Sequence, residues 1–388
     1  MKISPTAGKI DIQTINWNEA NKTRECTWHS ENAAPAPKKI LVTDDTIKAD
    51  IAYKLCCEGT ALLWRGDFQN AKLLMQAISR RIDRPRKKPK KTGETMLEAF
   101  HLHRQAQSQK ARILGMLVIE LSVGYNINLR RAPDVKAACE HAYGKSTQSI
   151  VVSLREILGL LGAYEWSKNG VDIPVMNNKI YPSYGVFSPI RGEYLDLVDV
   201  TPLPIPCNLA FDIGTGTGVL AAILANRGIT KIVATDNSHR ALDCALKNVN
   251  LLDLKNNVKL VEADLFPPVE YGKADLIVCN PPWLPAHPSS ALESAIYDEK
   301  SKMLKGFLNG LGAHLNKGGE GWLILSDFAE LLGLRTRDEL QGWINAAGLK
   351  VIERTDTKAR HPKTIDASDP LHTARKAEVT SLWRLSIQ

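Results

Sequence analysis

Apolar residues recur along the chain with two different periods, and the change of period divides it into regions. Between residues 44 and 162 they recur at three- and four-residue spacing, which is typical of helices with one buried face. Helices are expected at about 43–59, 67–82, 94–120, 132–144 and 146–162. Gly59, Gly144 and Gly162 act as stop signals for three of them. Residues 44–163 are therefore predicted to form an α-helical substrate-docking domain, and the polar, aperiodic residues 1–43 an irregular extension.

After this region the pattern changes to one of strands. Residues 164–190 contain short β-prone runs separated by the turn pairs Asn169-Gly170 and Asn177-Asn178, which predicts a β-hairpin linker. From residue 191 to 388 apolar runs alternate with helical patterns, as in a mostly parallel, doubly wound sheet. Strands are expected at 209–213, 231–235, 257–261, 274–279 and 321–326, and helices at 218–227, 238–250, 293–316 and 335–346.

The C-terminal end departs from this alternation. GLKVIERT and EVTSLWRLSI are two β-prone runs with no helical pattern between them, so we expect an antiparallel closing pair of strands. The fold class is thus α/β, with a seven-stranded sheet. The long polar segment 356–378 between the closing strands is either a lid or an irregular loop.

Composition places the chain among soluble globular proteins with more than one domain. It has 388 residues, of which 44% are hydrophobic and 24% charged. Its seven cysteines show no C-x-x-C spacing, which argues against zinc-ribbon and thioredoxin sites and favours reduced thiols in the cytoplasm. Neither a secretory signal at the N-terminus nor an apolar run of about 20 residues is present, so no membrane partner is expected. No metal site is predicted.

The net charge of +8 is concentrated in the N-terminal half of the chain. Residues 1–180 contain 28 Lys and Arg against 18 Asp and Glu, or +10, and residues 181–388 contain 22 against 24, or −2. The run RRIDRPRKKPKK, residues 80–91, holds eight basic residues and one acid. Such a run is either a solvated loop or a contact for the phosphates of RNA or DNA.

A glycine-rich loop follows the first expected strand of the C-terminal region. The sequence LAFDIGTGTGVLAAILANRG places glycines 214, 216 and 218 between a strand and a helix, where the backbone can turn tightly and approach a ligand. Val219 stands where a dinucleotide fingerprint has its third glycine, which disfavours nicotinamide cofactors. Asp212, just before the loop, could pair with an ammonium group.

Two further acids follow the next two strands. Asp236 lies where a carboxylate can accept hydrogen bonds from both hydroxyls of a ribose. Asp264, beside Leu265 and Phe266, suits the amino group and ring of an adenine. Because parallel strands end at one edge of a sheet, these acids and the glycine loop are expected to converge on a single crevice.

In this order and spacing, the motifs DIGTGTG, TDNS, EADLF and CNPPWLP resemble those of class I S-adenosylmethionine-dependent methyltransferases. The N-P-P-[YFW] motif is that of the subset that methylates planar nitrogens. Residues 171–198, VDIPVMNNKIYPSYGVFSPIRGEYLDLV, are similar to the hairpin and pre-core segment of HemK-type glutamine N5-methyltransferases, which also carry a helical N-terminal domain. The resemblance covers about residues 165–388 and implies a Rossmann-like fold.

The resemblance also implies the cofactor, S-adenosyl-L-methionine, and its site. The residues expected to contact it are Phe187, Ser188, Pro189, Arg191, Asp212, Gly214, Thr215, Gly216, Gly218, Asp236, Asn237, Asp264, Leu265 and Asn280. The expected catalytic residues are Asn280, Pro281, Pro282 and Trp283. Trp283 stands where the glutamine-modifying enzymes typically have tyrosine.

The acceptor motif has a chemical rationale. The nitrogen of an amide or of an exocyclic base amine has a delocalised lone pair and attacks a sulfonium poorly. The Asn280 side-chain oxygen and the Pro281 carbonyl can each accept one of its N–H bonds, which concentrates electron density on the nitrogen and directs it at the methyl group. Trp283 can stack on a flat acceptor.

Several acceptors remain open at this stage. The basic N-terminal half favours a nucleobase amino group in RNA or DNA, which would have to be flipped out or single-stranded. The hairpin resemblance favours a glutamine amide in a protein of the translation machinery. A small-molecule N-methyltransferase is a third possibility. A non-enzymatic, cofactor-binding RNA-interaction module is disfavoured, because Asn280 and both prolines are intact.

Overall fold

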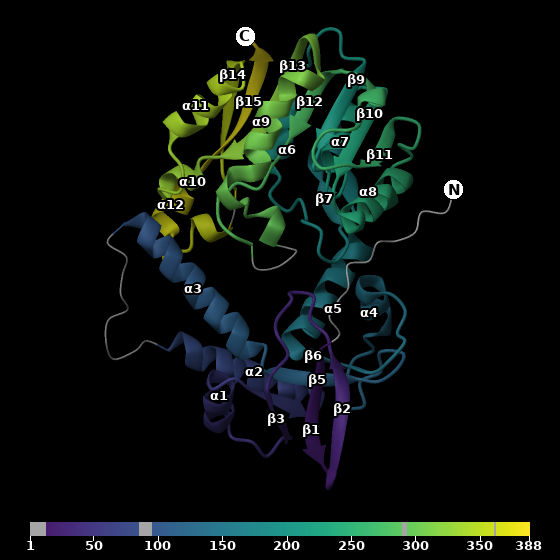
Figure 1. Ribbon diagram of the computed structural model, residues 1–388, viewed down its shortest axis with the longest axis vertical. Coiled ribbons are helices and arrows are strands. Elements are labelled where there is room, and N and C mark those ends of the chain that lie inside the picture. Colours follow the sequence, from purple (N-terminus) through teal and green to yellow (C-terminus); the bar gives the residue numbers. More distant parts are fainter. Residues whose placement is uncertain (1–12, 85–94, 289–292, 361) are drawn as a thin grey trace. The chain divides into compact units, whose positions relative to one another are not determined.

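The computed structural model describes residues 13–84, 95–288, 293–360 and 362–388. The chain forms two compact units, the first from residues 1–91 and 104–164 and the second from residues 92–103 and 165–388 (Figure 1). Within the described ranges, no helix combines the length and the apolar character needed to cross a bilayer.

The first unit contains a six-stranded mixed sheet, in the order β1-β2-β6-β5-β4-β3. Its strands are β1 (Thr14–Glu19), β2 (Lys22–Trp28), β3 (Lys39–Thr43), β4 (Thr60–Trp64), β5 (Leu117–Leu121) and β6 (Ile150–Ser153). Its helices are α1 (Ala49–Cys57), α2 (Phe68–Asp83) and α4 (Lys136–Tyr143), together with the parts of α3 (Met96–Leu114) and α5 (Leu154–Asn169) that belong to it.

The prediction of an irregular extension followed by an α-helical domain is therefore wrong. Five helices lie near their expected positions, but three strands fall within residues 1–43 and three more within 44–163. Strands β4, β5 and β6 are short, continuous apolar runs such as TALLW and LVIEL, in which Leu63 and Val118 are fully buried. Strand β1, by contrast, is a polar stretch, TINWNE, in which exposed and buried residues alternate. A buried strand of four or five residues lacks alternation, so periodicity cannot distinguish it from part of a buried helix.

The basic run 80–91 is only partly described. It begins in the last turn of α2, where the Arg81 guanidinium donates to Asp50 at 2.6 Å. Residues 85–91 lie outside the described residues, so the two interpretations of this run, a solvated loop and a phosphate contact, both stay untested.

The second unit contains a seven-stranded sheet in the order β11-β10-β9-β12-β13-β15-β14. The strands are β9 (Leu209–Ile213), β10 (Lys231–Asp236), β11 (Val258–Glu262), β12 (Ala274–Cys279), β13 (Leu315–Ser326), β14 (Leu349–Lys358) and β15 (Val379–Ile387). The first five are parallel to one another, and β15 pairs antiparallel with both β13 and β14. The expected sheet and its antiparallel closing pair are confirmed.

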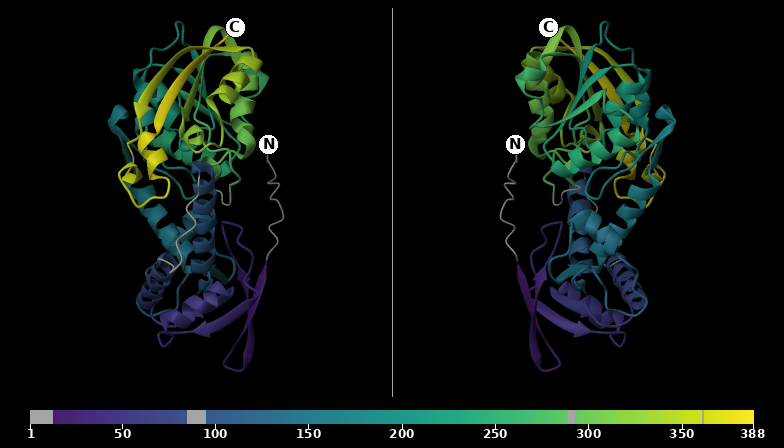
Figure 2. Two further views of the ribbon diagram at one scale, coloured as in Figure 1. Left: turned by 90° about the vertical axis from the view of Figure 1, so that its left-hand side faces the viewer. Right: turned by 90° about the vertical axis from the view of Figure 1, so that its right-hand side faces the viewer.

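Helices cover both faces of this sheet (Figure 2). Successive residues of a strand point to opposite faces, so Ala210 and Leu276 belong to one core with α6 (Glu193–Val200) and α7 (Val219–Asn226). Phe211 and Ile277 belong to the other core with α9 (Lys302–His314) and α11 (Arg337–Ala346). A central strand covered on both faces must be apolar throughout, and all six residues of β12 are buried.

The remaining elements of this unit are short helices and one hairpin. They are α8 (His239–Leu251), α10 (Phe328–Leu331), α12 (His372–Ala377), the 3₁₀ turns η1 (Pro174–Met176), η2 (Val269–Tyr271), η3 (Glu293–Ala295), η4 (Glu299–Ser301) and η5 (Pro362–Thr364), and the antiparallel strands β7 (Val171–Ile173) and β8 (Asn178–Ile180). The predicted hairpin is present, although α5 extends into its expected range.

The expected helix 293–316 is interrupted and begins as an α-helix only at Lys302. Lys300 and Ser301 have φ angles of 57° and 55°, which break the helical path. The buried Asp298 carboxylate then accepts hydrogen bonds from the backbone N–H groups of Met303 and Leu304, at 2.9 and 3.0 Å, and so caps the new helix.

The long segment 356–378 is largely folded. Strand β14 runs to Lys358, and Leu371 and Ala374, at α12, are buried in a cluster with Phe100 of α3 and Leu284. Leu284 directly follows the Asn-Pro-Pro-Trp motif. The C-terminal insertion and the start of α3 therefore pack against the chain that leaves this motif.

Candidate active site

The four strands β9, β10, β11 and β12 run parallel, so their carboxyl ends meet at one edge of the sheet. The glycine loop follows β9, Asp236 ends β10, Asp264 follows β11, and Asn280 follows β12. The predicted convergence of these segments on one edge is thus present in the fold.

The glycine loop is fixed by backbone hydrogen bonds and by positive φ angles. Glycines 214, 216 and 218 have φ values of 72°, 55° and 81°, a region that residues with a Cβ rarely adopt. The Thr215 N–H donates to the Thr235 carbonyl at 2.8 Å, which ties the loop to β10. A Cβ placed on Gly216 would meet no atom within 4 Å, so this side of the loop is open.

Behind the loop, the buried Asn248 of α8 holds the chain in place. Its side-chain N–H group donates to the Thr217 carbonyl at 3.0 Å, and its side-chain oxygen accepts from the Tyr181 N–H at 2.8 Å. One amide therefore joins the glycine loop to the segment that follows the β-hairpin.

Asp212 is completely buried and only half hydrogen-bonded. Its Oδ2 atom accepts from the Thr215 hydroxyl at 2.6 Å and from the Ala221 N–H at 3.1 Å. Its Oδ1 atom has no partner among the residues that the structure describes. Burial raises the pKa of this carboxyl to about 6, and the hydrogen bonds offset only part of that effect. An unpaired buried carboxylate oxygen favours the approach of a cation.

Asp236 and the turn at Asp264 complete the edge. The Asp236 carboxylate accepts from the N–H groups of Gly216 and Ser238, both at 3.0 Å, and burial raises its pKa. Asn237 follows it. Asp264 is exposed, and the next residue, Leu265, has a φ of 74° and accepts a hydrogen bond from the Thr235 hydroxyl at 2.5 Å. These contacts place both turns beside the glycine loop.

The Asn-Pro-Pro-Trp motif leaves the buried strand β12 at this edge. The Trp283 indole N–H donates to the Asn280 side-chain oxygen at 2.9 Å. Pro281 is buried and Pro282 is half-buried. The half-buried Trp283 ring packs against both cores of the sheet, and the Arg191 guanidinium lies over one of its faces, 4.8 Å from the ring centroid.

The segment before α6, which contains Phe187, Ser188, Pro189 and Arg191, differs in burial from one residue to the next. Phe187 is partly exposed, Pro189 is buried, and the buried Ser188 hydroxyl has no partner in the described part of the chain. Arg191 was expected at the cofactor, but its contacts are with Trp283 and with two buried carboxylates, Glu193 at 2.8 Å and Glu378 at 3.1 Å.

Comparison with known proteins gives matches to methyltransferases over this part of the chain. The family model of the methyltransferase small domain matches residues 185–334. A protein from Methanocaldococcus jannaschii, described as a putative protein N5-glutamine methyltransferase, is 31% identical over 158 residues, which are 38% of this chain and 75% of that protein. This chain belongs to the HemK-like class I S-adenosylmethionine-dependent methyltransferases.

Further relatives are more distant or matched over a smaller share. A release factor glutamine methyltransferase of Caulobacter vibrioides is 28% identical over 45% of this chain and 63% of its own. The chain thus spans less than two thirds of that relative. A solved methyltransferase structure from Pyrococcus furiosus matches 59% of this chain and 98% of its own, with 17% identity and a TM-score of 0.39.

The residues at the carboxyl edge of this methyltransferase fit S-adenosylmethionine. The unpaired Asp212 Oδ1 atom matches the positive charge of the cofactor, and the open side of Gly216 leaves room for a ligand against the backbone. The Asp236 carboxylate lies directly beside this loop. The assignment of individual contacts to these residues remains a prediction.

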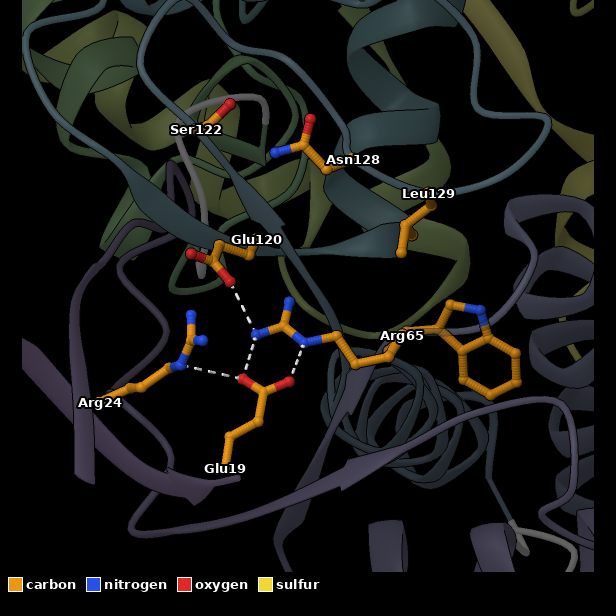
Figure 3. A pocket seen from close by; sticks show the side chains of 8 residues that line it. Glu19, Arg24, Arg65, Glu120, Ser122, Asn128 and Leu129 are labelled. Atoms are coloured by element: carbon orange, nitrogen blue, oxygen red, sulfur yellow. Dashed lines mark hydrogen bonds and ion pairs between the residues drawn. The ribbon is translucent and has the colours of Figure 1, made fainter. Parts of the chain in front are cut away.

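The first unit contains a separate polar cavity of about 230 Å³ (Figure 3). The Arg65 guanidinium donates to both Glu19 oxygens at 2.8 Å and forms an ion pair with Glu120 at 2.8 Å. Arg24 approaches Glu19 at 3.4 Å. The hydrogen bond from Arg65 is the main reason why the pKa of Glu19 falls to about 2. Two carboxylates and two guanidiniums balance each other and tie β1 and β2 to β4 and β5.

Proposed function

We propose that this methyltransferase transfers a methyl group to the side-chain amide nitrogen, N5, of a protein glutamine. Both curated relatives described above are named for glutamine, and the one from Caulobacter vibrioides is named for a glutamine of a release factor. They support the second of the two macromolecular acceptors inferred from the sequence, and they give no support to a nucleobase. A protein of the translation machinery is accordingly the first acceptor to test.

The observation that carries the proposal is the position of Asn280. Its carboxamide stands at the end of β12, next to the strand β9 that leads into the glycine loop. S-adenosylmethionine, when bound, supplies an electrophilic methyl group on a sulfonium. The role of the protein is to hold a neutral amide nitrogen in line with that methyl group and to make the nitrogen more nucleophilic.

Asn280 can do this through its side-chain oxygen. A carbonyl oxygen accepts two hydrogen bonds, and among the residues that the structure describes one is supplied, by the Trp283 indole. In the proposed reaction the second comes from one N–H of the acceptor amide, and the Pro281 carbonyl accepts the other N–H. Both contacts draw electron density toward the nitrogen. In the transfer the nitrogen would bond to the methyl carbon as the carbon–sulfur bond breaks, and it would then lose one of its two protons to water.

The environment of Trp283 also favours a small acceptor. A nucleobase would gain from stacking on the indole, but one face of that ring lies against Arg191 and the ring packs against both cores. A primary carboxamide has no ring and needs only the two acceptor oxygens. This geometry is compatible with a glutamine amide, and the preference over a base amino group rests on the relatives.

The decisive experiment is methyl transfer from labelled cofactor into a fractionated lysate and into a purified release factor. The expected label is resistant to nuclease, sensitive to protease and located on glutamine N5 by mass spectrometry. The Asn280→Ala variant provides the background. Label that is released by nuclease, or that is confined to small molecules, would overturn the proposal.

A further inference from the structure

The hydrogen bond between Trp283 and Asn280 decides which end of the Asn280 amide faces the acceptor. The indole N–H is a donor only, so its partner must be the side-chain oxygen. If the amide were rotated by half a turn, its NH2 group would meet the indole N–H and also face the NH2 group of the substrate. Both contacts would place donors against donors.

The Trp283 ring is itself held in place by neighbouring side chains. The Arg191 guanidinium covers one face of the ring, and its own nitrogen atoms are bound by Glu193 and Glu378. The side chain of Glu193 is fully buried and that of Glu378 is 3% exposed. A guanidinium stays charged at all accessible pH values, so Arg191 does not lose its side of these ion pairs by titration.

A second support comes from the start of β15. The Glu378 carboxylate oxygen that contacts Arg191 also accepts a hydrogen bond from the Ser326 hydroxyl at 2.7 Å. The chain of contacts therefore runs from Ser326 and Glu378 through Arg191 and Trp283 to the amide of Asn280. Each group in this chain contacts the next one, and Arg191 is bound by Glu193 as well.

We propose that Trp283 is a positioning residue, whose indole N–H locks the Asn280 side chain with its oxygen toward the acceptor. Arg191 holds the ring in the required plane. The stacking role expected from the sequence is then not the main role of Trp283. This inference rests on the proposed transfer to an amide nitrogen, because it requires Asn280 to accept a hydrogen bond from the substrate.

The most direct test removes the N–H and keeps the ring. In one variant, the indole of Trp283 is replaced by benzothiophene, which has nearly the same shape and carries sulfur in place of N–H. The Trp283→Phe variant removes the same donor with a smaller ring. Trp28→Phe is the matched control, since Trp28 donates its indole N–H to the Ala34 carbonyl at 2.8 Å in the first unit.

Both Trp283 variants should lower kcat by about ten- to a hundredfold, because a misplaced acceptor atom costs rates of this order. The KM for the acceptor and the Kd for the cofactor should stay near the wild-type values, since the fold and the cofactor loop are intact. Trp28→Phe should leave kcat unchanged. A benzothiophene variant with wild-type kcat would overturn the inference, even though glutamine methylation itself would stand.

A second measurement does not depend on knowing the acceptor. The indole N–H signal of Trp283 is identified in a proton–nitrogen correlation spectrum as the one that disappears in Trp283→Phe. In Asn280→Ala this signal should move upfield, as expected for a lost hydrogen bond, while the Trp28 signal stays in place. An unchanged Trp283 signal would refute the contact, and it would do so whichever acceptor the enzyme uses.

Discussion

Replacing Asp212 with asparagine tests the electrostatics of the cofactor site. The folded protein holds this carboxyl at a pKa of about 6, against an ordinary value of 3.8. The difference is about 2 units, and at about 1.4 kcal/mol per unit the ionised side chain destabilises the folded state by about 3 kcal/mol. Asparagine removes the charge and keeps the oxygen that accepts from Thr215 and Ala221, but its NH2 group would replace Oδ1 without an acceptor, so about 3 kcal/mol is the upper limit of the gain.

The sign of the pH dependence follows from the raised pKa. Above about pH 6 the carboxyl is ionised in both the folded and the unfolded chain, so the full cost is present. Between pH 6 and 3.8 the folded state keeps its proton while the unfolded chain loses it, and the cost declines to zero. Asp212→Asn should therefore stabilise the cofactor-free protein at pH 7.5 by up to about 3 kcal/mol, with a gain that declines as the pH falls toward 4.

The assay is thermal unfolding at pH 7.5, 5.5 and 4.5. For a unit of this size, 3 kcal/mol corresponds to a rise in Tm of roughly 6–12 °C. Asp67→Asn is the control of opposite sign: Asp67 is equally buried, but Arg131 and Arg130 bind it and hold its pKa well below the usual range, so asparagine should destabilise the first unit. Destabilisation by Asp212→Asn at pH 7.5, or a gain independent of pH, would refute the reasoning.

The same substitution should weaken cofactor binding. Loss of one contact between opposite charges reduces affinity by about ten- to a hundredfold. Calorimetric titration with S-adenosylmethionine at pH 7.5 measures this directly. A variant that is more stable and yet binds the cofactor less well would show that the unpaired carboxylate is retained for binding. Unchanged affinity would show that Asp212 does not meet the positive charge of the cofactor.

Three further predictions concern other parts of the chain. Asn280→Ala should lower kcat by about a hundredfold or more while leaving the Tm unchanged, as measured by turnover and thermal unfolding. Gly216→Ala should reduce cofactor affinity in calorimetry, whereas Gly228→Ala, which also has a positive φ and open space around it, should cost similar stability without affecting binding. Glu19, whose pKa Arg65 lowers to about 2, stabilises the fold fully above about pH 4.5 and progressively less toward pH 2. Glu19→Gln should therefore lower the Tm at pH 7 and have little effect near pH 2.

The fold of the second unit was predictable because its signals are local. Strand β12 is six consecutive buried residues followed by two prolines, and β9 leads directly into a loop of three glycines with positive φ. Each such stretch contains both the apolar run that forms the strand and the residues that end it. Parallel order then brings the strand ends to one edge without further information.

The first unit was mispredicted because its strands carry no comparable end signals. Strand β5 follows α3 after two residues, and β6 passes directly into α5. In both places an apolar strand and an apolar helix face merge into one run of the sequence. Only pairing with distant strands, such as β6 with β2, distinguishes the two, and this pairing leaves no local mark.

The contacts that hold the Asn-Pro-Pro-Trp motif in place could not be predicted from the sequence for a related reason. Arg191 and Glu378 are 187 residues apart, and the ion pair between them exists only because α6 and the start of β15 meet in the folded sheet. The hydrogen bond from Trp283 to Asn280 joins residues three apart, yet it depends on the rotamers of both side chains. The spacing of the motif indicated that Asn280 and Trp283 belong to one site, but it did not indicate the hydrogen bond between them.

The cofactor side and the acceptor side of the proposed site bind their ligands through different kinds of polar group, and each kind suits its ligand. On the cofactor side a carboxylate oxygen is buried without a partner, which is costly until a positive charge arrives. On the acceptor side the Asn280 amide is neutral and already oriented by Trp283, with one lone pair left for an N–H. The fixed, neutral oxygen of Asn280 binds the substrate N–H more strongly as positive charge develops on the attacking nitrogen. It therefore lowers the barrier more than it strengthens ground-state binding.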